Sequence, residues 1–298
     1  MRAAISSLIA LRTLAVARAF APTAARAARA PSHGAAADRI ELDGHTFERV
    51  RVAVTDELAL DVFEAGAAAQ DALVERACAP DLAAAAGGAD PYGAVLWPAA
   101  LAVARRCAEI APETLAAVRV LELGAGTGLA SRAAAACGAR EVLATDYEPL
   151  PLRLLAAADA GSGRVSTRLF DVADPSAALP PGELVLVADL LYDKATARAL
   201  AKRVDEAYRR GSRVIVGDSP GRPGRETFLT NCRARLPPEA ATTFAEVDAR
   251  RVTGPRHELI CGDGSTSVAR GGGDAEPLPI ALLDLIPPGW PPERCPTS

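Results

Sequence analysis

The sequence predicts a doubly wound α/β fold whose seven-stranded sheet is mostly parallel and ends in an antiparallel edge pair. Three observations predict it. Apolar strand candidates alternate with helix candidates from residue 118 onward. The first of these strands ends in three glycines at every second position, followed by a helix, and several later strands end in an acid. Because ligands of such sheets bind beyond the carboxyl ends of the strands, we expect the functional site there.

The first 37 residues differ in composition from the rest of the chain. They contain five arginines and no acid, which is typical of an organelle-targeting segment that is later cleaved. Ala17-Arg18-Ala19 followed by Phe20 resembles the bipartite plastid signals of algae with plastids of secondary red origin. We therefore expect a plastid protein, with the mitochondrion as the alternative. The arginines are Arg2, Arg12, Arg18, Arg26 and Arg29.

Charge and cysteine usage exclude several classes of function. Removal of residues 1–37 takes the net charge from -4 to -9, because the segment holds five arginines and no acid. An acidic protein without a basic stripe is not expected to bind nucleic acid. The six cysteines form no C-x-x-C pair and the three histidines do not cluster with them, so we expect neither a metal site nor a disulfide framework. We also expect a monomer without stable membrane insertion.

Residues 38–117 are predicted to form an N-terminal extension of short strands and helices on the substrate side, with a lid over the cofactor. Short alternating runs in Arg39–Ala65 indicate one or two strands, and an alanine-rich helix follows. The segment from Ala89 to Ala102 is a turn leading into a helix. Trp97 lies just before that helix, and we expect it to contact the cofactor, with core packing as the alternative.

Strands and helices alternate through the remainder of the chain. Two late strands are expected to form the antiparallel pair at one edge of the sheet. The strand candidates are Val118–Leu123, Glu141–Thr145, Val165–Phe170, Leu184–Ala188 and Arg213–Gly217, and the late strands are Thr243–Val247 and Ile280–Leu285. A Pro-rich tail, residues 287–298, ends the chain.

The glycine-rich turn indicates a nucleotide cofactor. Gly124, Gly126 and Gly128 allow the backbone to turn tightly and approach a ligand, and the helix after them presents free N–H groups. Asp146, twenty residues past Gly126, ends the next strand and can accept the hydroxyls of a ribose. NAD enzymes and S-adenosylmethionine enzymes share this arrangement. Glu122 inside the first strand favours S-adenosylmethionine, because a dinucleotide fingerprint has no use for an acid there.

Acids stand near the ends of five predicted strands: Glu122, Asp146, Asp171, Asp189 and Asp218. We expect the glycines to contact the methionine part of the cofactor, and Glu122 to orient their loop or to meet the amino group through water. Asp146 is expected to bind the ribose. Asp171 is expected to accept the adenine amino group, with the Val172 N–H facing a ring nitrogen. Any of these acids could instead cap a helix or turn, as Asp171 could before Pro175.

These motifs resemble a known family. Glu122-x-Gly124-x-Gly126-x-Gly128 is similar to the first motif of the class I, seven-β-strand, Rossmann-like methyltransferases that use S-adenosyl-L-methionine. Asp189-Leu190-Leu191-Tyr192, the Pro91–Trp97 segment and Val216-Gly217-Asp218 resemble the protein-lysine methyltransferases with an Asp/Glu-x-x-Tyr/Phe motif. The likeness is greatest to the electron-transfer-flavoprotein β-subunit lysine methyltransferases, over about Asp90 to Phe228. It implies a methyltransferase domain at 118–286, with an insertion around 252–278.

The resemblance implies transfer of methyl groups to a lysine side chain of an organellar protein. Asp189 and Tyr192 are then the expected catalytic residues: Asp189 orients the amine or relays its proton, and the Tyr192 ring holds the cation. A cap of the helix that starts near Lys194 is the alternative for Asp189. Two other functions fit the same fold, namely a small-molecule N- or O-methyltransferase and a cofactor-binding assembly factor without transferase activity.

Overall fold

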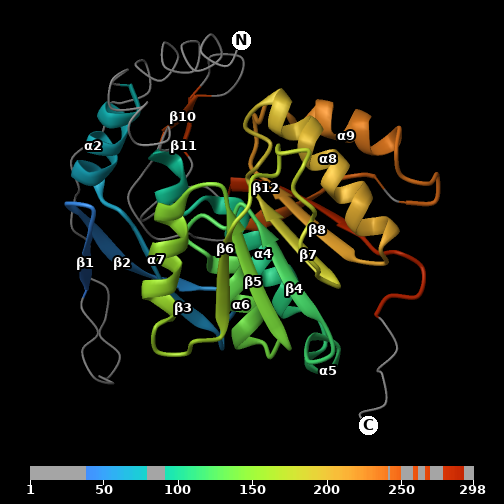
Figure 1. Cartoon of the computed structure of the whole chain (residues 1–298), viewed down its shortest axis with the longest axis horizontal. Helices are drawn as coiled ribbons and strands as arrows, with labels where there is room; N and C mark the ends of the chain where they lie inside the picture. The colour runs from blue at the N-terminus through green and yellow to red at the C-terminus, as the bar shows by residue number, and fades with distance from the viewer. Residues whose placement is uncertain are drawn as a thin grey trace.

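The computed structural model describes residues 38–78, 91–240, 242–249, 258–260, 266–268 and 278–291. The predicted targeting segment 1–37 lies outside this part of the chain, as does most of the expected insertion at 252–278. The predicted seven-stranded sheet is confirmed, with the strand order β6-β5-β4-β7-β8-β12-β9 (Figure 1). Its strands are β4 (Arg119–Leu123), β5 (Glu141–Asp146), β6 (Val165–Leu169), β7 (Leu184–Ala188), β8 (Arg213–Asp218), β9 (Ala245–Ala249) and β12 (Leu278–Leu285).

The predicted antiparallel edge pair is also confirmed. The strands from β6 to β8 all pair in parallel. In contrast, β12 runs antiparallel to both β8 and β9. The carboxyl ends of β5, β4, β7 and β8 therefore lie side by side, and the acids in or directly after these strands lie near this end of the sheet.

Helices cover both faces of the sheet. On one face lie α4 (Pro98–Ala108), α6 (Leu129–Ala136) and α7 (Pro149–Asp159), and on the other α8 (Lys194–Arg209) and α9 (Arg225–Arg233). The short helix α5 (Pro112–Leu115) leads into β4. Because both faces are covered, β7 and β8 are apolar almost throughout, as buried parallel strands are. Helix α8 is amphipathic, and it buries small and apolar side chains at helical spacing while its charged face points to solvent.

A separate antiparallel sheet forms from the N-terminal extension: β1 (Arg39–Leu42), β2 (His45–Ala53) and β3 (Ala59–Ala65). The prediction of one or two strands in this region is wrong, because Asp43-Gly44 forms a two-residue hairpin turn. Both residues have positive φ, 52° and 77°, which this kind of turn requires. The extension continues with α2 (Ala67–Cys78) and the 3₁₀ turn η1 (Pro91–Ala94), and β10 (Glu258–Ile260) and β11 (Thr266–Val268) pair separately.

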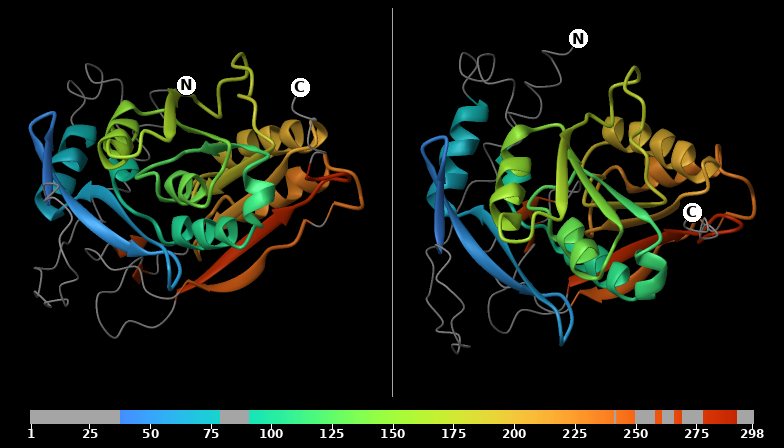
Figure 2. Two further views of the ribbon diagram at one scale, coloured as in Figure 1. Left: turned by 90° about the horizontal axis from the view of Figure 1, so that it is seen from below. Right: turned by 60° about the horizontal axis from the view of Figure 1, so that its bottom comes forward.

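The N-terminal sheet packs on the outside of the helices α4, α6 and α7 (Figure 2). Val52 and Val62 contact Leu101 of α4 and Leu129 of α6 through one apolar cluster. A buried carboxylate adds a polar link, since Glu64 Oε2 of β3 accepts the Leu96 N–H at 3.0 Å. This link fixes the chain between η1 and α4, which leads into the site. Within the described residues, the helices are too short or too polar to span a membrane.

Candidate active site

The glycine-rich turn between β4 and α6 has the left-handed backbone that only glycine adopts at low cost. Gly124, Gly126 and Gly128 have φ of 67°, 51° and 77°. A Cβ at Gly124 would lie 2.5 Å from Leu190 Cδ2, and one at Gly128 would lie 2.4 Å from a methyl of Leu155. A Cβ at Gly126 would meet only the Gly93 carbonyl, at 3.4 Å. The turn is therefore packed against the protein at both ends and is less crowded in its middle.

Glu122 lies buried beneath this turn. Its Oε2 accepts the Ser131 N–H at 2.9 Å, and Ser131 belongs to the first turn of α6. Burial, aided by the nearby Asp146, raises the pKa of Glu122 to about 8, and the hydrogen bond from Ser131 acts against this rise. The carboxyl group thus orients the helix that follows the turn. Contact of Glu122 with a cofactor amino group stays a prediction.

Asp146, the last residue of β5, joins its strand to the glycine turn. Asp146 Oδ2 accepts the Gly126 N–H at 3.0 Å, and Oδ1 accepts the Glu148 N–H at 3.1 Å. The Ala125 N–H donates to the Thr145 carbonyl at 2.8 Å, so the turn is held at two consecutive residues. The structure thus brings Asp146 and the glycines together. The binding of ribose by Asp146 stays a prediction.

Asp171 lies on the exposed turn after β6, next to Phe170, whose N–H donates to the Asp146 carbonyl at 2.8 Å. Its Oδ1 accepts the Ala173 N–H at 2.8 Å, as expected of a turn cap. The carbonyl of the next residue, Val172, accepts a hydrogen bond from Arg203 Nε at 3.2 Å. The adenine contacts expected of Asp171 and Val172 stay predictions.

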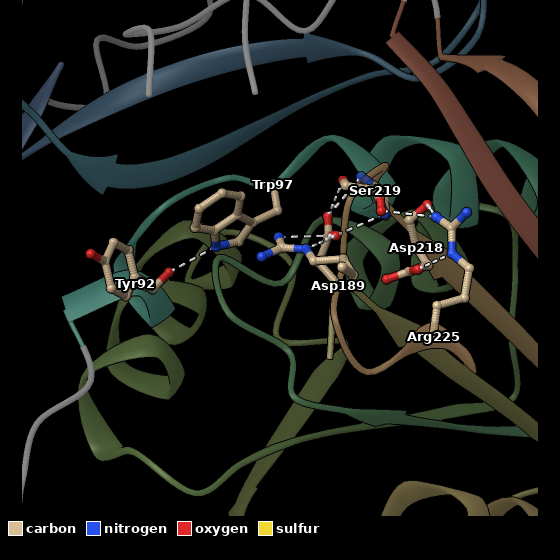
Figure 3. Close-up of polar contacts among 8 residues, drawn as sticks. Tyr92, Trp97, Asp189, Asp218, Ser219 and Arg225 are labelled. Carbon is tan, nitrogen blue, oxygen red and sulfur yellow. Dashed lines mark hydrogen bonds and ion pairs between the residues drawn. The ribbon is translucent and has the colours of Figure 1, made fainter. Parts of the chain in front are cut away.

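Asp189 follows β7 and is the centre of a buried polar cluster (Figure 3). Its φ is 56°, unusual for a residue with a side chain. Asp189 Oδ1 accepts the Ser219 N–H at 3.0 Å, and Oδ2 accepts the Ser219 hydroxyl at 2.9 Å and the Ala99 N–H at 3.1 Å. The alternative that Asp189 caps the helix starting at Lys194 is wrong. Asp193 caps that helix, and Asp189 instead caps the first turn of α4.

Arg222, which the sequence motifs did not single out, completes this cluster. Its Nε and Nη2 lie 3.2 and 3.1 Å from Asp189 Oδ1, and its guanidinium carbon is 4.8 Å from the centre of the Trp97 ring. The Trp97 indole N–H donates to the Tyr92 carbonyl at 3.0 Å (Figure 3). The one sequence signal for Arg222 was its place in the Pro- and Gly-rich loop after β8. That loop gave no indication that Arg222 reaches Asp189.

Asp218, the last residue of β8, is completely buried beside Asp189. Its Oδ2 accepts a hydrogen bond from Arg225 Nε at 2.5 Å, and among the described residues Oδ1 has no hydrogen-bond partner. Burial, together with the charge of Asp189, raises the pKa of Asp218 to about 7, and Arg225 opposes this rise. The ends of β7 and β8 therefore bring two acids and two arginines together.

Tyr192 lies at the surface, with 38% of its area exposed. Leu190, two residues earlier, is the residue that packs against Gly124. The structure therefore places the Asp189–Tyr192 segment directly beside the glycine-rich turn, with Asp189 pointing inward. No group of metal-ligating side chains occurs in the part of the chain that the structure describes.

Comparison with known proteins gives a consistent family. A family model described as lysine methyltransferase matches residues 79–235. The electron transfer flavoprotein beta subunit lysine methyltransferase of Danio rerio is 30% identical over 152 residues, which cover 47% of this chain and 52% of the relative. Its counterpart from Xenopus laevis is 32% identical over 149 residues, covering 48% and 56%. The chain thus spans about half the length of the curated relatives it matches.

Solved structures show a more distant likeness. The N-methyltransferase NodS from Bradyrhizobium japonicum, in complex with S-adenosyl-L-homocysteine, is 16% identical, with a TM-score of 0.40. The match covers 74% of this chain and 98% of that one.

Proposed function

This chain belongs to the lysine methyltransferase family, and on that premise we propose that it transfers methyl groups from S-adenosyl-L-methionine to a lysine side chain of an organellar protein. The observation that carries the proposal is the contact of Leu190 with Gly124. This contact sets the Asp189–Tyr192 segment beside the turn expected to hold the cofactor. An amine bound at Tyr192 would therefore lie near a methyl group held at the turn.

The residues around the glycine-rich turn suit S-adenosylmethionine. The middle of the turn, at Gly126, has room that any side chain would fill. The carboxylate of Asp146 stands next to it, where it can accept the two ribose hydroxyls. Gly124, Gly126 and Gly128 would face the methionine part, and Trp97 would border the site. When bound, the cofactor supplies an activated methyl group on a sulfonium, so the protein's main task is alignment.

A lysine can accept the methyl group only after it loses its proton. Its pKa in water is about 10.4. A pocket that removes the amine from water lowers this pKa, because desolvation disfavours the charged form. The partly exposed ring of Tyr192 can hold the incoming ammonium by cation–π attraction before the proton leaves.

For Asp189, the contacts favour a role in orienting the protein segments around the site over a role in relaying the proton of the amine. Each of its two oxygens already accepts two or more hydrogen bonds from protein groups. A carboxylate has about four lone-pair positions, so little acceptor capacity remains. Asp189→Asn and Asp189→Ala would both leave the largely buried Arg222 guanidinium without its anion, a change that typically costs about 3–5 kcal/mol. The melting temperature of each variant is therefore measured beside its single-turnover rate, and a lowered melting temperature with a near-normal rate would reject a role of Asp189 in transfer.

Methyl transfer is tested with purified protein, methyl-labelled S-adenosylmethionine and organelle lysate. We expect label in the lysine of a protein. Label in small molecules alone would indicate a small-molecule methyltransferase, and cofactor binding without transfer would indicate an assembly factor.

Residues 1–37 are proposed to direct import into the plastid, with the mitochondrion as the alternative. A fusion of this segment to a fluorescent protein tests the import and the choice of organelle.

Gly126→Arg should abolish binding of the methyl donor, because the side chain fills the middle of the turn. Gly163→Arg is the matched control. Gly163 also has positive φ, 60°, with nothing within 4 Å of an added Cβ, and it lies away from the turn. Calorimetry with S-adenosylhomocysteine should show no binding to the first variant and normal binding to the second. Equal affinities for the two would contradict the proposed cofactor site.

A further inference from the structure

We propose that Arg222 is a positioning residue for methyl transfer. It clamps the Pro91–Trp97 segment to the end of β7 and so fixes the position of that segment over the glycine-rich turn. The inference rests on the proposed function. It starts from the place of the guanidinium group, which lies between the Asp189 carboxylate and the Trp97 ring. Only 11% of the Arg222 side chain is exposed, so both contacts are largely shielded from water.

The Asp189 end of this clamp is rigid. The Asp189 N–H donates to the Gly217 carbonyl at 3.0 Å, which ties it to β8. Its carboxylate also holds the Ala99 N–H of α4 and both donors of Ser219. Two hydrogen bonds to such a fixed anion hold the guanidinium group in place. The entropic cost is small, because the planar group loses little freedom per hydrogen bond.

The Trp97 end reaches the glycine-rich turn through short contacts. The Trp97 indole N–H donates a hydrogen bond to the Tyr92 carbonyl and so closes the segment on itself. The centres of the Tyr92 and Trp97 rings lie 6.1 Å apart. Gly93, the next residue, has its carbonyl 3.4 Å from the position of a Cβ on Gly126. A Cβ on Gly93 itself would be 2.8 Å from Pro151 of α7. Movement of the Trp97 ring would therefore shift the backbone that lies on the turn.

A second cluster of the same chemistry lies away from the site. Arg213, the first residue of β8, binds Asp284 through Nε at 2.8 Å and Nη2 at 2.6 Å, and its guanidinium carbon is 4.8 Å from the Trp290 ring. Its side chain is 6% exposed. Arg213 lies at the opposite end of β8 from Asp218. Arg213→Lys is therefore the matched control for Arg222→Lys, with similar chemistry and no contact with the site.

The experiment compares the two lysine variants in the full protein. Lysine keeps the charge and loses the planar fork, so both variants should have lower melting temperatures. We expect Arg222→Lys to weaken S-adenosylhomocysteine affinity about 10-fold, the equivalent of about one charged hydrogen bond. Its single-turnover rate should fall by about 10-fold to 10²-fold, the scale of a small misplacement. Arg213→Lys should retain the affinity and the rate. Added guanidinium ion should partly restore the single-turnover rate of Arg222→Ala and should not raise the rate of Arg213→Ala.

Fluorescence quenching, like the affinity, is measured without a methyl acceptor. The chain has two tryptophans, so Trp290→Phe leaves Trp97 as its only indole. In that background, Arg222→Lys should increase quenching of Trp97 fluorescence by acrylamide. Unchanged quenching, together with an affinity equal to that of Arg213→Lys, would overturn the inference. If the wild-type protein binds the cofactor product yet methylates no lysine, the proposed function fails, while affinity and quenching still decide the role of Arg222.

Discussion

Replacement of Glu122 by Gln should change how stability depends on pH. Glu122 lies within β4 with 1% of its area exposed, and burial raises its pKa to about 8. In the unfolded chain this pKa is close to its usual value of about 4.3. Between these two values the folded protein keeps a proton that the unfolded chain has lost. The free energy of unfolding therefore falls as the pH rises, by at most about 1.4 kcal/mol per pH unit from this group.

In Glu122→Gln this titration is absent, while an amide oxygen can still accept the Ser131 N–H. The variant should therefore gain stability relative to the wild type as the pH rises, by a total of several kcal/mol, on the order of what a shift of about three pKa units represents. The difference should level off above about pH 8. Urea unfolding at a series of pH values from about 5 to 9 measures it. Asp218 titrates in both proteins, so its contribution cancels.

Glu183→Gln is the control, because the pKa of Glu183 is shifted in the opposite direction. Although burial acts to raise it, the hydrogen bonds from Arg119 hold the pKa of Glu183 below its usual value. Glu183 thus stabilises the fold above its unfolded pKa, and this contribution is lost as the pH falls through the folded pKa. Its variant should be less stable than the wild type at neutral pH, with no further change up to about pH 9. A constant difference between the wild type and Glu122→Gln from about pH 5 to 9 would refute the reasoning.

Two further predictions concern the glycine-rich turn and the surface tyrosine. Gly128→Ala should destabilise the protein by more than about 1 kcal/mol in urea unfolding, because φ is 77° and the new Cβ would lie 2.4 Å from Leu155; an unchanged midpoint would contradict this packing. Tyr192→Phe should retain most of the single-turnover rate and Tyr192→Ala should lose it, since the ring would supply the proposed cation–π contact. Equal losses in both variants would point to the hydroxyl instead.

Local patterns in the sequence were sufficient for the architecture of the main sheet. Leu184–Ala188 was predicted with the bounds that β7 has, because an apolar run between turns is typical of a strand buried on both faces. The order strand, turn, helix, strand along the chain was enough to bring Asp146, at the end of β5, next to the glycine-rich turn, while the contacts of both with a cofactor stay predictions. The hairpin at Asp43-Gly44 was missed although its signal is equally local.

The surroundings of Asp189 were decided by the tertiary structure alone. Its partners Ala99 and Arg222 are 90 and 33 residues away in the sequence. The sequence located the acid at a strand end, and the one helix that it offered for capping by Asp189, the helix starting near Lys194, is the wrong one. Only the packing of α4 across the sheet brings the Ala99 N–H to the carboxylate, and only the path of the loop after β8 brings Arg222 to it. Periodicity and turn signals report on neighbours along the chain, whereas the acceptors and donors of a buried charge come from whichever segments the fold brings into contact with it.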